Sequence, residues 1–443
     1  MSPRQLIVSL LDRYEKTGAY ADRLLESEFK TRQVAVSDRA LVQEVFFGVL
    51  RWQLRLDWII SQFYDGDYTK APANIRHILQ LSFYQLLYLD KIPDYAVIHE
   101  AVKLAKKIRG DYWGKKINAI LRAFQRNRDQ IRWPDRSVAP IDSIAIEYSH
   151  PHWLVQRWME QWGLEETIAL CQADNQTPQI SLRVNRLKNS RHELQKMLAS
   201  LQIEALPSPY LDDFLIAERL PELSNFSPFQ QGLFTVQDVS AGLACRLLAP
   251  EAGERILDLC AAPGGKTTYL AELMGDRGII VAVDRYFNRL QLVSNSVQRL
   301  RLKSVQLVQA DGTQFACQPV DRILLDAPCS GLGVLAKRVD LRWKRTAAAI
   351  DELADLQLRL LENAGQLLKT GGVLVYCTCT IEPAENEQVI SRFLTRHKEF
   401  EIERATEPIA PELITKEGFI STRPQRDGMD GSFAARLKKV VRE

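Results

Sequence analysis

Two cysteines of this sequence lie in short motifs that each follow a predicted strand. Cys329 belongs to the segment Asp326-Ala-Pro-Cys-Ser-Gly331, and Cys379 belongs to Tyr376-Cys-Thr-Cys-Thr380. The default expectation for a free cysteine is a small buried hydrophobic side chain. A thiolate is also a soft nucleophile, and the carboxyl end of a strand is where substrate meets cofactor in an open α/β sheet. Both cysteines are therefore candidates for covalent catalysis.

Four aspartates occupy comparable positions. Asp258, Asp284, Asp311 and Asp326 fall at or just after the ends of four successive predicted strands. A single aspartate there is usually a helix cap or a turn former. Four of them together indicate a shared ligand site, because ligands of open α/β sheets bind outside the carboxyl ends of the strands.

A glycine-rich loop with the sequence Cys-Ala-Ala-Pro-Gly-Gly-Lys follows Asp258, at Cys260–Lys266. A phosphate-binding P-loop would need a glycine at Cys260, and the GxGxxG fingerprint of dinucleotide-binding proteins is absent. S-adenosylmethionine is the remaining common ligand for such a loop. A carboxylate at Asp284 suits the ribose diol of this ligand, and Asp311 is placed to accept a hydrogen bond from the adenine amino group.

A thiol beside a methyl donor points to one particular reaction. Methyl transfer to a nitrogen lone pair needs no covalent nucleophile, whereas carbon 5 of cytosine is not nucleophilic as it stands. Addition of a thiolate to carbon 6 turns the ring into an enamine, and carbon 5 can then attack the methyl sulfonium. Two cysteines can divide the addition and the release between them, but this chemistry alone does not choose between Cys329 and Cys379.

The elements that position these residues alternate between strands and helices from about residue 232 onward. The predicted strands are Arg255–Leu259, Ile279–Asp284, Val305–Val308, Arg322–Asp326 and Val373–Thr378. Residues 285–302 and 350–368 are predicted helices between them. This alternation predicts an α/β domain with a doubly wound parallel sheet over residues 233–443.

Helical spacing dominates the N-terminal part of the chain. Apolar residues recur at that spacing throughout residues 1–135, which predicts an all-α bundle. Prolines mark a connector over residues 134–150. Helix and strand patterns then alternate over a short span that suits a small α+β module. We therefore expect three domains, at residues 1–135, 145–232 and 233–443.

Positive charge is concentrated between Lys103 and Arg132. This stretch has ten basic and two acidic residues, although the whole chain has a net charge of only +3. Such a stretch is either a solvated helix face or a surface that contacts RNA phosphates. Aromatic residues that can stack on unpaired bases or pack in a core lie among these charges: Tyr112, Trp113, Phe124 and Trp133.

The overall composition is that of an ordinary globular protein. The chain has 443 residues, of which 46% are apolar and 26% charged. Its apolar runs are too short to span a membrane, and the N-terminus lacks the pattern of a signal peptide. The seven cysteines include no C-x-x-C pair, so we expect neither a metal site nor a disulfide framework. These features predict a cytoplasmic monomer with no membrane association.

These motifs together resemble the Sun/RsmB family of ribosomal RNA small-subunit methyltransferases, almost from end to end of the chain. The matching segments before residue 130 are Asp38-Arg39, Gly48-Val-Leu-Arg51, Ile92-Pro93 and Asn118-Ala-Ile-Leu-Arg122. The middle of the chain contributes Pro151, Trp153 and Leu182-Arg-Val-Asn185. The matching segments after residue 232 are Val236-Gln-Asp238, Ser240-Ala241, Cys260–Lys266, Asp326–Gly331, Thr378-Cys379, Glu385-Asn386-Glu387 and Asp430-Gly431.

The resemblance implies a NusB-like RNA-binding domain at 1–135, a small RNA-binding module at 145–232, and a Rossmann-like S-adenosylmethionine-dependent methyltransferase domain at 233–443. It implies methylation of carbon 5 of a cytosine in 16S ribosomal RNA through a covalent cysteine–cytosine intermediate. Cys379 would be the nucleophile, Cys329 would assist product release, and Asp326 would stabilise charge during thiol addition. The cofactor-binding residues implied by the resemblance are Cys260, Ala261, Ala262, Pro263, Gly264, Gly265, Lys266, Asp284, Asp311 and Asp326.

Two alternative functions remain open at this point. The catalytic motifs do not encode the substrate, so a transfer RNA is a possible target. A non-catalytic RNA-binding factor with a vestigial methyltransferase domain is a second alternative, although the intact Asp326, Cys329 and Cys379 argue against it. The family often has serine where Cys377 stands, so we expect Cys377 to be structural.

Overall fold

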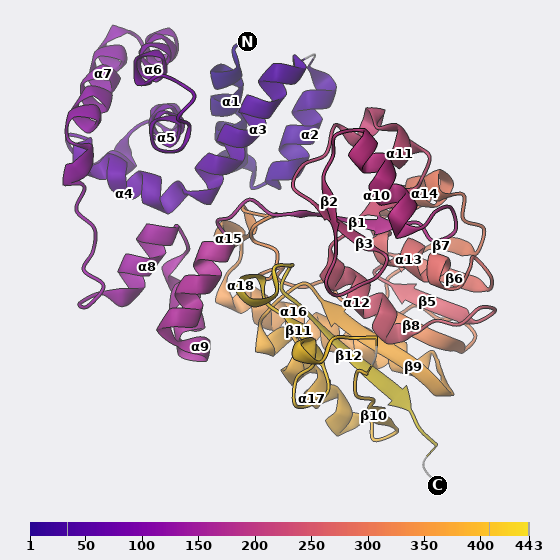
Figure 1. Ribbon diagram of the computed structural model, residues 1–443. Helices are drawn as coiled ribbons and strands as arrows, with labels where there is room; N and C mark the ends of the chain where they lie inside the picture. The colour runs from indigo at the N-terminus through magenta and orange to yellow at the C-terminus, as the bar shows by residue number, and fades with distance from the viewer. Residues whose placement is uncertain (33, 407, 442–443) are drawn as a thin grey trace. The chain divides into compact units, whose positions relative to one another are not determined.

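The computed structural model of this protein describes residues 1–32, 34–406 and 408–441 and divides the chain into two units (Figure 1). The helical unit comprises residues 1–175 and 338–344, and the sheet unit comprises residues 176–337 and 345–443. Among the described residues, no helix combines the length and the apolar composition that crossing a membrane requires.

The helical unit confirms the predicted all-α bundle. Its elements are α1 (Pro3–Thr17), α2 (Ala21–Thr31), α3 (Val36–Arg51), α4 (Gln53–Phe63), η1 (Tyr68–Lys70), α5 (Ala73–Tyr88), α6 (Asp94–Arg109), α7 (Asp111–Arg126), η2 (Arg128–Gln130), α8 (Pro140–Tyr148), α9 (His152–Ala173) and the short α15 (Leu341–Lys344). Helix α5 is buried along most of its length, as expected of a helix that is apolar on nearly all sides. Phe124 packs on Phe63 and Phe83 in this core and so cannot stack on a base.

Two features of the helical unit differ from the expectation. The connector predicted over residues 134–150 contains α8, because Pro140 occupies the first turn of a helix, where its missing N–H costs nothing. Residues 338–344 join this unit although they follow strand β8 in the sequence. The fully buried Arg342 donates to the Ser149 carbonyl at 3.1 Å and to Asn175 Oδ1 at 2.9 Å, and Trp343 Nε1 donates to the Leu50 carbonyl at 2.6 Å.

A small antiparallel sheet begins the sheet unit, with strand order β2-β3-β1-β4. Its elements are β1 (Ile180–Val184), α10 (Arg191–Ser200), β2 (Ala205–Pro207), β3 (Phe214–Ala217), η3 (Leu223–Asn225), α11 (Ser227–Gln230) and β4 (Phe234–Val236). Alternate apolar residues of these strands pack with α10 in one core that includes Leu182, Leu194 and Phe234. This arrangement confirms the predicted α+β module.

The large sheet has the strand order β10-β12-β9-β8-β5-β6-β7, and β11 also pairs with β12. Its strands are β5 (Arg255–Leu259), β6 (Ile279–Asp284), β7 (Val305–Gln309), β8 (Val320–Asp326), β9 (Leu368–Thr378), β10 (Phe400–Ile402), β11 (Ile420–Thr422) and β12 (Ser432–Lys439). The five strands predicted from the sequence are parallel, whereas β12 runs antiparallel to β9. The sequence pattern did not indicate this edge, since β10 and β11 are only three residues long.

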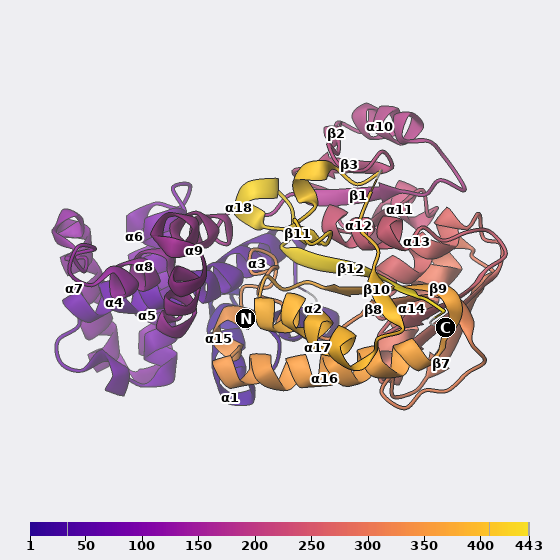
Figure 2. The same cartoon turned by 90° about the horizontal axis from the view of Figure 1, so that it is seen from below.

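Helices cover both faces of the large sheet (Figure 2). The helices on one face are α12 (Val239–Leu248), α13 (Gly265–Leu273) and α14 (Phe287–Leu300), and those on the other are α16 (Ala347–Gln366) and α17 (Glu387–Arg396). The remaining short elements are η4 (Pro383–Glu385), η5 (Pro411–Leu413) and α18 (Pro424–Asp427). The strand order reverses between β5 and β8, and this switch point is where open α/β sheets bind ligands.

Candidate active site

The two cysteine motifs lie side by side because their strands are neighbours. Strands β8 and β9 pair in parallel with Asp326 opposite Cys377, so the loops that follow leave the sheet at the same edge. The Sγ atoms of Cys329 and Cys379 are 3.3 Å apart. Both side chains are partly accessible, so a substrate atom can approach the pair.

The contact between the two thiols makes them chemically unequal. A hydrogen bond from Cys329 lowers the pKa of Cys379, against the effect of burial, and the same contact together with burial raises the pKa of Cys329 well above its usual value. The carboxylate of Glu385 raises the pKa of Cys329 further, and the ammonium of Lys266 helps to lower that of Cys379. The thiolate is therefore favoured on Cys379.

Lys266 joins the glycine-rich loop to the end of β8. Its Nζ lies 2.7 Å from Asp326 Oδ2. Burial lowers the pKa of Lys266, but the Asp326 carboxylate and the nearby Cys377 and Cys245 together hold it above the usual value. The buried Cys377 donates a weak hydrogen bond from Sγ to Asp326 Oδ1 at 3.6 Å, which fits a structural role for this thiol.

Glycines and a buried acid shape the loop Cys260–Lys266. Gly264 begins α13 with a φ of +100°, and a Cβ there would approach Val293 to 3.0 Å, so a side chain is disfavoured on both grounds. Asp258 is fully buried beneath the loop and accepts a hydrogen bond from Thr267 Oγ1 at 2.5 Å. Burial raises the pKa of Asp258 to about 7. These contacts hold the first turn of α13 against the end of β5.

The two aspartates predicted for the nucleoside part of the cofactor line one cavity together with Cys260 and Pro328. Asp284 is 3% exposed, and its carboxylate accepts from the backbone N–H of Ala262 at 3.2 Å and of Tyr286 at 3.0 Å. The side chain of Asp311 is 38% exposed. Hydrogen bonds from the backbone and hydroxyl of Thr313 lower the pKa of Asp311. Asp284 therefore supports the glycine-rich loop as well as facing the cavity.

Arg183 of strand β1 supports the same loop, although the sequence assigned it no role. This buried guanidinium donates to the Gly265 carbonyl at 2.6 Å, to Thr268 Oγ1 at 3.0 Å and to Glu272 Oε1 at 2.8 Å. The small antiparallel sheet thus fixes the start of α13. The only sequence signal was the position of Arg183 in the segment Leu182-Arg-Val-Asn185.

Comparison with known proteins assigns this chain to a family. Residues 1–126 match the NusB family, residues 150–220 match a Methyltr_RsmF/B-like, ferredoxin-like domain, and residues 245–438 match the family described as 16S rRNA methyltransferase RsmB/F. A relative from Synechocystis sp., named Probable ribosomal RNA small subunit methyltransferase B, is 39% identical over 99% of this chain and 100% of its own length. The chain belongs to the RsmB/F family.

Two solved structures are similar to this RsmB/F chain. The crystal structure of PH0851 aligns with a TM-score of 0.82 and 28% identity and covers 99% of both chains. The crystal structure of NSun6 from Pyrococcus horikoshii with SFG aligns with a TM-score of 0.61 and 27% identity, over 66% of this chain and 99% of that chain. The predicted fold class is confirmed: a NusB-like helical domain and a small α+β module precede a Rossmann-like methyltransferase domain.

Proposed function

We propose that this protein transfers a methyl group from S-adenosylmethionine to carbon 5 of a cytosine in 16S ribosomal RNA. The observation that carries the proposal is the pair of thiols, 3.3 Å apart, at the ends of adjacent parallel strands. Methyl transfer to nitrogen or oxygen gives no reason for such a pair, whereas activation of carbon 5 requires a nucleophile at carbon 6 and a separate release step.

The residues around the cavity fit S-adenosylmethionine. The cofactor would supply an electrophilic methyl group on a sulfonium. Asp284 is a buried carboxylate at the end of β6, as a ribose diol requires, and Asp311 follows β7 on the same cavity. Pro328 also lines the cavity and directly precedes Cys329, so the cavity reaches the segment that carries this cysteine. The tight turn at Gly264 leaves the backbone of the loop free to approach a ligand closely.

Cys379 is the nucleophile in this proposal. Its thiolate adds to carbon 6 of cytosine, and electron density moves to carbon 5. Carbon 5 then bonds to the methyl carbon as the methyl–sulfonium bond breaks, and the cofactor leaves as the neutral thioether S-adenosylhomocysteine. Loss of the carbon 5 proton and cleavage of the carbon 6–sulfur bond return the thiolate and release methylated RNA. The hydrogen bond from Cys329 and the neighbouring Lys266 favour the charged form of Cys379. Cys329 assists the release step by accepting the carbon 5 proton, after it has lost its own proton to solvent once Cys379 is bonded to carbon 6.

Asp326 and Lys266 prepare the site for the base. Their ion pair lies between the cofactor loop and the end of β8, next to the segment that leads to Cys329. A paired carboxylate there can accept a hydrogen bond from the exocyclic amino group of cytosine and stabilise charge in the ring during thiol addition. The pairing also compensates two partly buried charges, which would otherwise destabilise the fold.

Ribosomal RNA is the proposed substrate because the relatives, and the family model that matches residues 245–438, carry that name. The exposed basic residues of α6 and α7 supply a surface for its phosphates. Lys103, Lys107 and Lys115 are exposed to solvent, whereas Lys116 lies 4.1 Å above the ring of Tyr64. Exposed lysine side chains of this kind bind RNA phosphates without preference for the RNA sequence.

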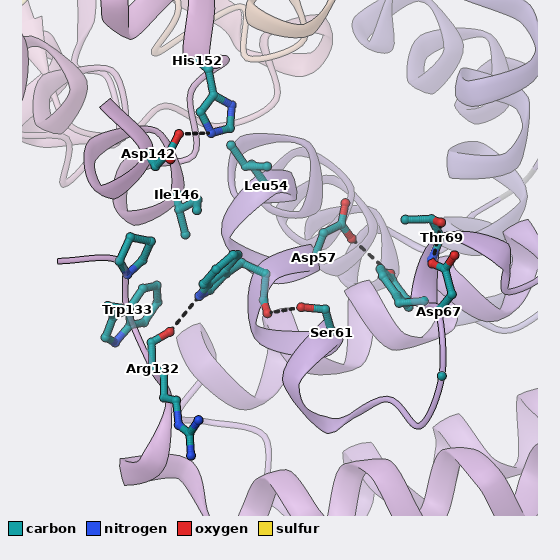
Figure 3. Close-up of a pocket in the computed structure, with 14 residues that line it drawn as sticks. Leu54, Asp57, Ser61, Asp67, Thr69, Arg132, Trp133, Asp142, Ile146 and His152 are labelled. Carbon is teal, nitrogen blue, oxygen red and sulfur yellow. Dashed lines mark hydrogen bonds and ion pairs between the residues drawn. The ribbon is translucent and has the colours of Figure 1, made fainter. Parts of the chain in front are cut away.

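A nearby cavity is less suited to phosphate. Figure 3 shows Arg132 and Trp133 beside a cavity of about 670 Å³ within the helical unit. The carboxylates of Asp57, Asp67 and Asp142 also line it, and three negative charges oppose binding of an anion. We therefore place the phosphate contacts on the outer face of α6 and α7.

Replacement of Lys106, Lys107, Lys115 and Lys116 by glutamine is expected to weaken RNA binding. The slope of log Kd against log salt concentration should fall by up to about 0.7–0.9 for each lost phosphate contact. Filter binding of deproteinised ribosomal RNA over a salt series measures this slope. As a control, Lys398→Gln removes an exposed lysine of the sheet unit and should leave the slope as it is. An unchanged slope in the variant with all four substitutions would show that these lysines form a solvent-exposed helix face that makes no phosphate contacts.

The proposed function has a direct test. The full-length protein is incubated with methyl-labelled S-adenosylmethionine and deproteinised 16S ribosomal RNA, with transfer RNA in a parallel reaction. We expect label in the ribosomal RNA only, at a cytosine that bisulfite sequencing reports as protected. Label in transfer RNA alone would transfer the proposal to that substrate, and incorporation into neither RNA would contradict the enzymatic function.

A further inference from the structure

Glu385 holds the loop that carries Cys329, although it lies after the other cysteine in the sequence. Its side chain is fully buried. Oε1 accepts the backbone N–H of Ser330 at 2.7 Å and Nε2 of Gln357 at 3.0 Å, and Oε2 accepts the Ser330 hydroxyl. Gln357 also donates to the Pro328 carbonyl at 3.0 Å. Glu385 thus fixes Ser330 directly and Pro328 through Gln357, and these are the two chain neighbours of Cys329.

Asn386 makes the corresponding contacts around Cys379. It is 3% exposed. Its Oδ1 accepts the hydroxyl of Thr378 at 2.6 Å, and its Nδ2 donates to the carbonyl of Thr380 at 2.9 Å. Thr378 and Thr380 are the two chain neighbours of Cys379, so one side chain fixes the backbone before and after the proposed nucleophile.

Further hydrogen bonds connect these two sets of contacts. The hydroxyls of Ser330 and Thr380 lie 2.8 Å apart, and Tyr376 donates its hydroxyl to the Glu385 carbonyl at 2.5 Å. The backbone N–H of Gly333 donates to the Cys379 carbonyl at 3.1 Å. Hydrogen bonds therefore join the two loops that carry the cysteines. This network fixes the separation of the two sulfur atoms.

Glu385 also brings a negative charge to one side of the thiol pair. Its carboxylate bonds the residue next to Cys329, where it opposes formation of a thiolate on that cysteine. Other charged groups also act on the pair. Asp326 and Asp430 raise the pKa of Cys379, and Lys266 lowers it. Arg345 donates to the Cys329 carbonyl at 3.4 Å.

We propose that Glu385 and Asn386 are positioning residues that hold the two thiols in contact and keep their shared proton on Cys329. Adjacent in sequence, they control opposite members of the pair. Glu385 sets which sulfur is charged, and Asn386 sets where the charged sulfur lies. The assignment of this charged sulfur as the nucleophile rests on the proposed function, but the unequal ionisation of the two thiols does not.

Site-resolved alkylation tests this proposal without RNA or cofactor. The full-length protein reacts with iodoacetamide between about pH 6 and pH 9, and peptide mass spectrometry follows Cys329 and Cys379 separately, since only the thiolate reacts. In the wild-type protein Cys379 should react faster than Cys329. Glu385→Gln keeps a side chain of the same shape but removes the charge, and it should reduce the ratio of the two rates by about tenfold, mainly through faster reaction at Cys329.

Two further variants make the test specific. Asn386→Ala should also reduce the ratio, but through slower reaction at Cys379, because the residues on either side of Cys379 lose their contacts from the Thr378 hydroxyl and the Thr380 carbonyl to Asn386. Glu387→Gln changes a neighbouring carboxylate outside this network and should leave the ratio as in the wild type. If Glu385→Gln does not fold, as judged by circular dichroism, Ser330→Ala provides a second variant. It removes the hydroxyl that contacts Glu385 and Thr380 and should reduce the ratio in the same direction.

A ratio that stays at the wild-type value in a folded Glu385→Gln and in Ser330→Ala would overturn the proposal. An equal effect of Glu387→Gln would also overturn it, because the change would then reflect general electrostatics. Failure of the proposed function has a different signature. If the wild-type protein methylates no RNA while the alkylation ratio responds as expected, the positioning role of Glu385 holds and the assigned reaction is wrong.

Discussion

Replacement of Cys379 by alanine is expected to abolish methyl transfer, by at least about 10⁴-fold, and to leave no covalent link between protein and RNA. The expectation follows from the proposed chemistry, in which carbon 5 has no route to the methyl group until a thiolate has added to carbon 6. Cys329 is close enough to donate to Cys379, at 3.3 Å, but its own ionisation is disfavoured, so it should not replace the missing nucleophile.

Replacement of Cys329 by alanine should have a different result. Addition at carbon 6 needs only one thiolate, so the link to RNA should still form, although more slowly because Cys379 loses a hydrogen-bond donor. Release requires a separate proton transfer, and we expect it to slow by about 10²-fold or more. A protein–RNA species should therefore accumulate on a denaturing gel with Cys329→Ala and be missing with Cys379→Ala.

A third thiol provides the control for this pair. Cys317 is partly exposed but lies after β7, on a segment outside the thiol pair, and Cys317→Ala should behave as the wild type. Accumulation of the linked species in Cys379→Ala instead would exchange the roles of the two cysteines. Full activity in both single variants would contradict covalent catalysis altogether.

Asp284→Ala should weaken binding of S-adenosylmethionine by about 2–4 kcal/mol, or roughly 30-fold to 1000-fold in Kd. The buried carboxylate is the charged acceptor proposed for the ribose hydroxyls, and it also accepts the N–H of Ala262 in the glycine-rich loop. Both losses act in the same direction. Isothermal titration calorimetry with the full-length protein measures the affinity.

Two variants separate these contributions. Asp284→Asn keeps an acceptor for the Ala262 N–H and should recover part of the affinity. Asp311→Ala changes a carboxylate that is far more exposed than Asp284, so we expect a smaller loss than for Asp284→Ala. Unchanged affinity in Asp284→Ala would remove this residue from the cofactor site.

Much of the fold could be predicted because local patterns specify it. The strand Arg322–Asp326 has an uninterrupted apolar centre at Ile323–Leu325, as expected of a strand buried on both faces, and the helices between the strands have one apolar face. The antiparallel edge formed by β12 was harder to predict from the sequence. Its pairing with β9 joins segments far apart in sequence, and neither β10 nor β11 is long enough to show a period.

The kinds of residue at the candidate site were evident from the sequence, but their contacts were not. The order of the motifs placed Asp326, Cys329 and Cys379 at strand ends, since a strand end is a local feature. The approach of the two sulfur atoms depends on β8 and β9 being neighbours in register, which is a property of the whole sheet. The same is true of Lys266 and Asp326, which are sixty residues apart in sequence and 2.7 Å apart in space.

The sequence by itself indicated methyl transfer, because the cofactor loop and the two cysteine motifs are contiguous segments that a linear pattern reveals. Only the tertiary structure decided how the two thiols differ. Glu385 and Asn386 follow Cys379 closely in the chain, yet Glu385 bonds the loop of Cys329, more than fifty residues earlier. Which of the two sulfur atoms carries the negative charge depends on burial and on contacts between distant segments. A linear sequence pattern contains neither.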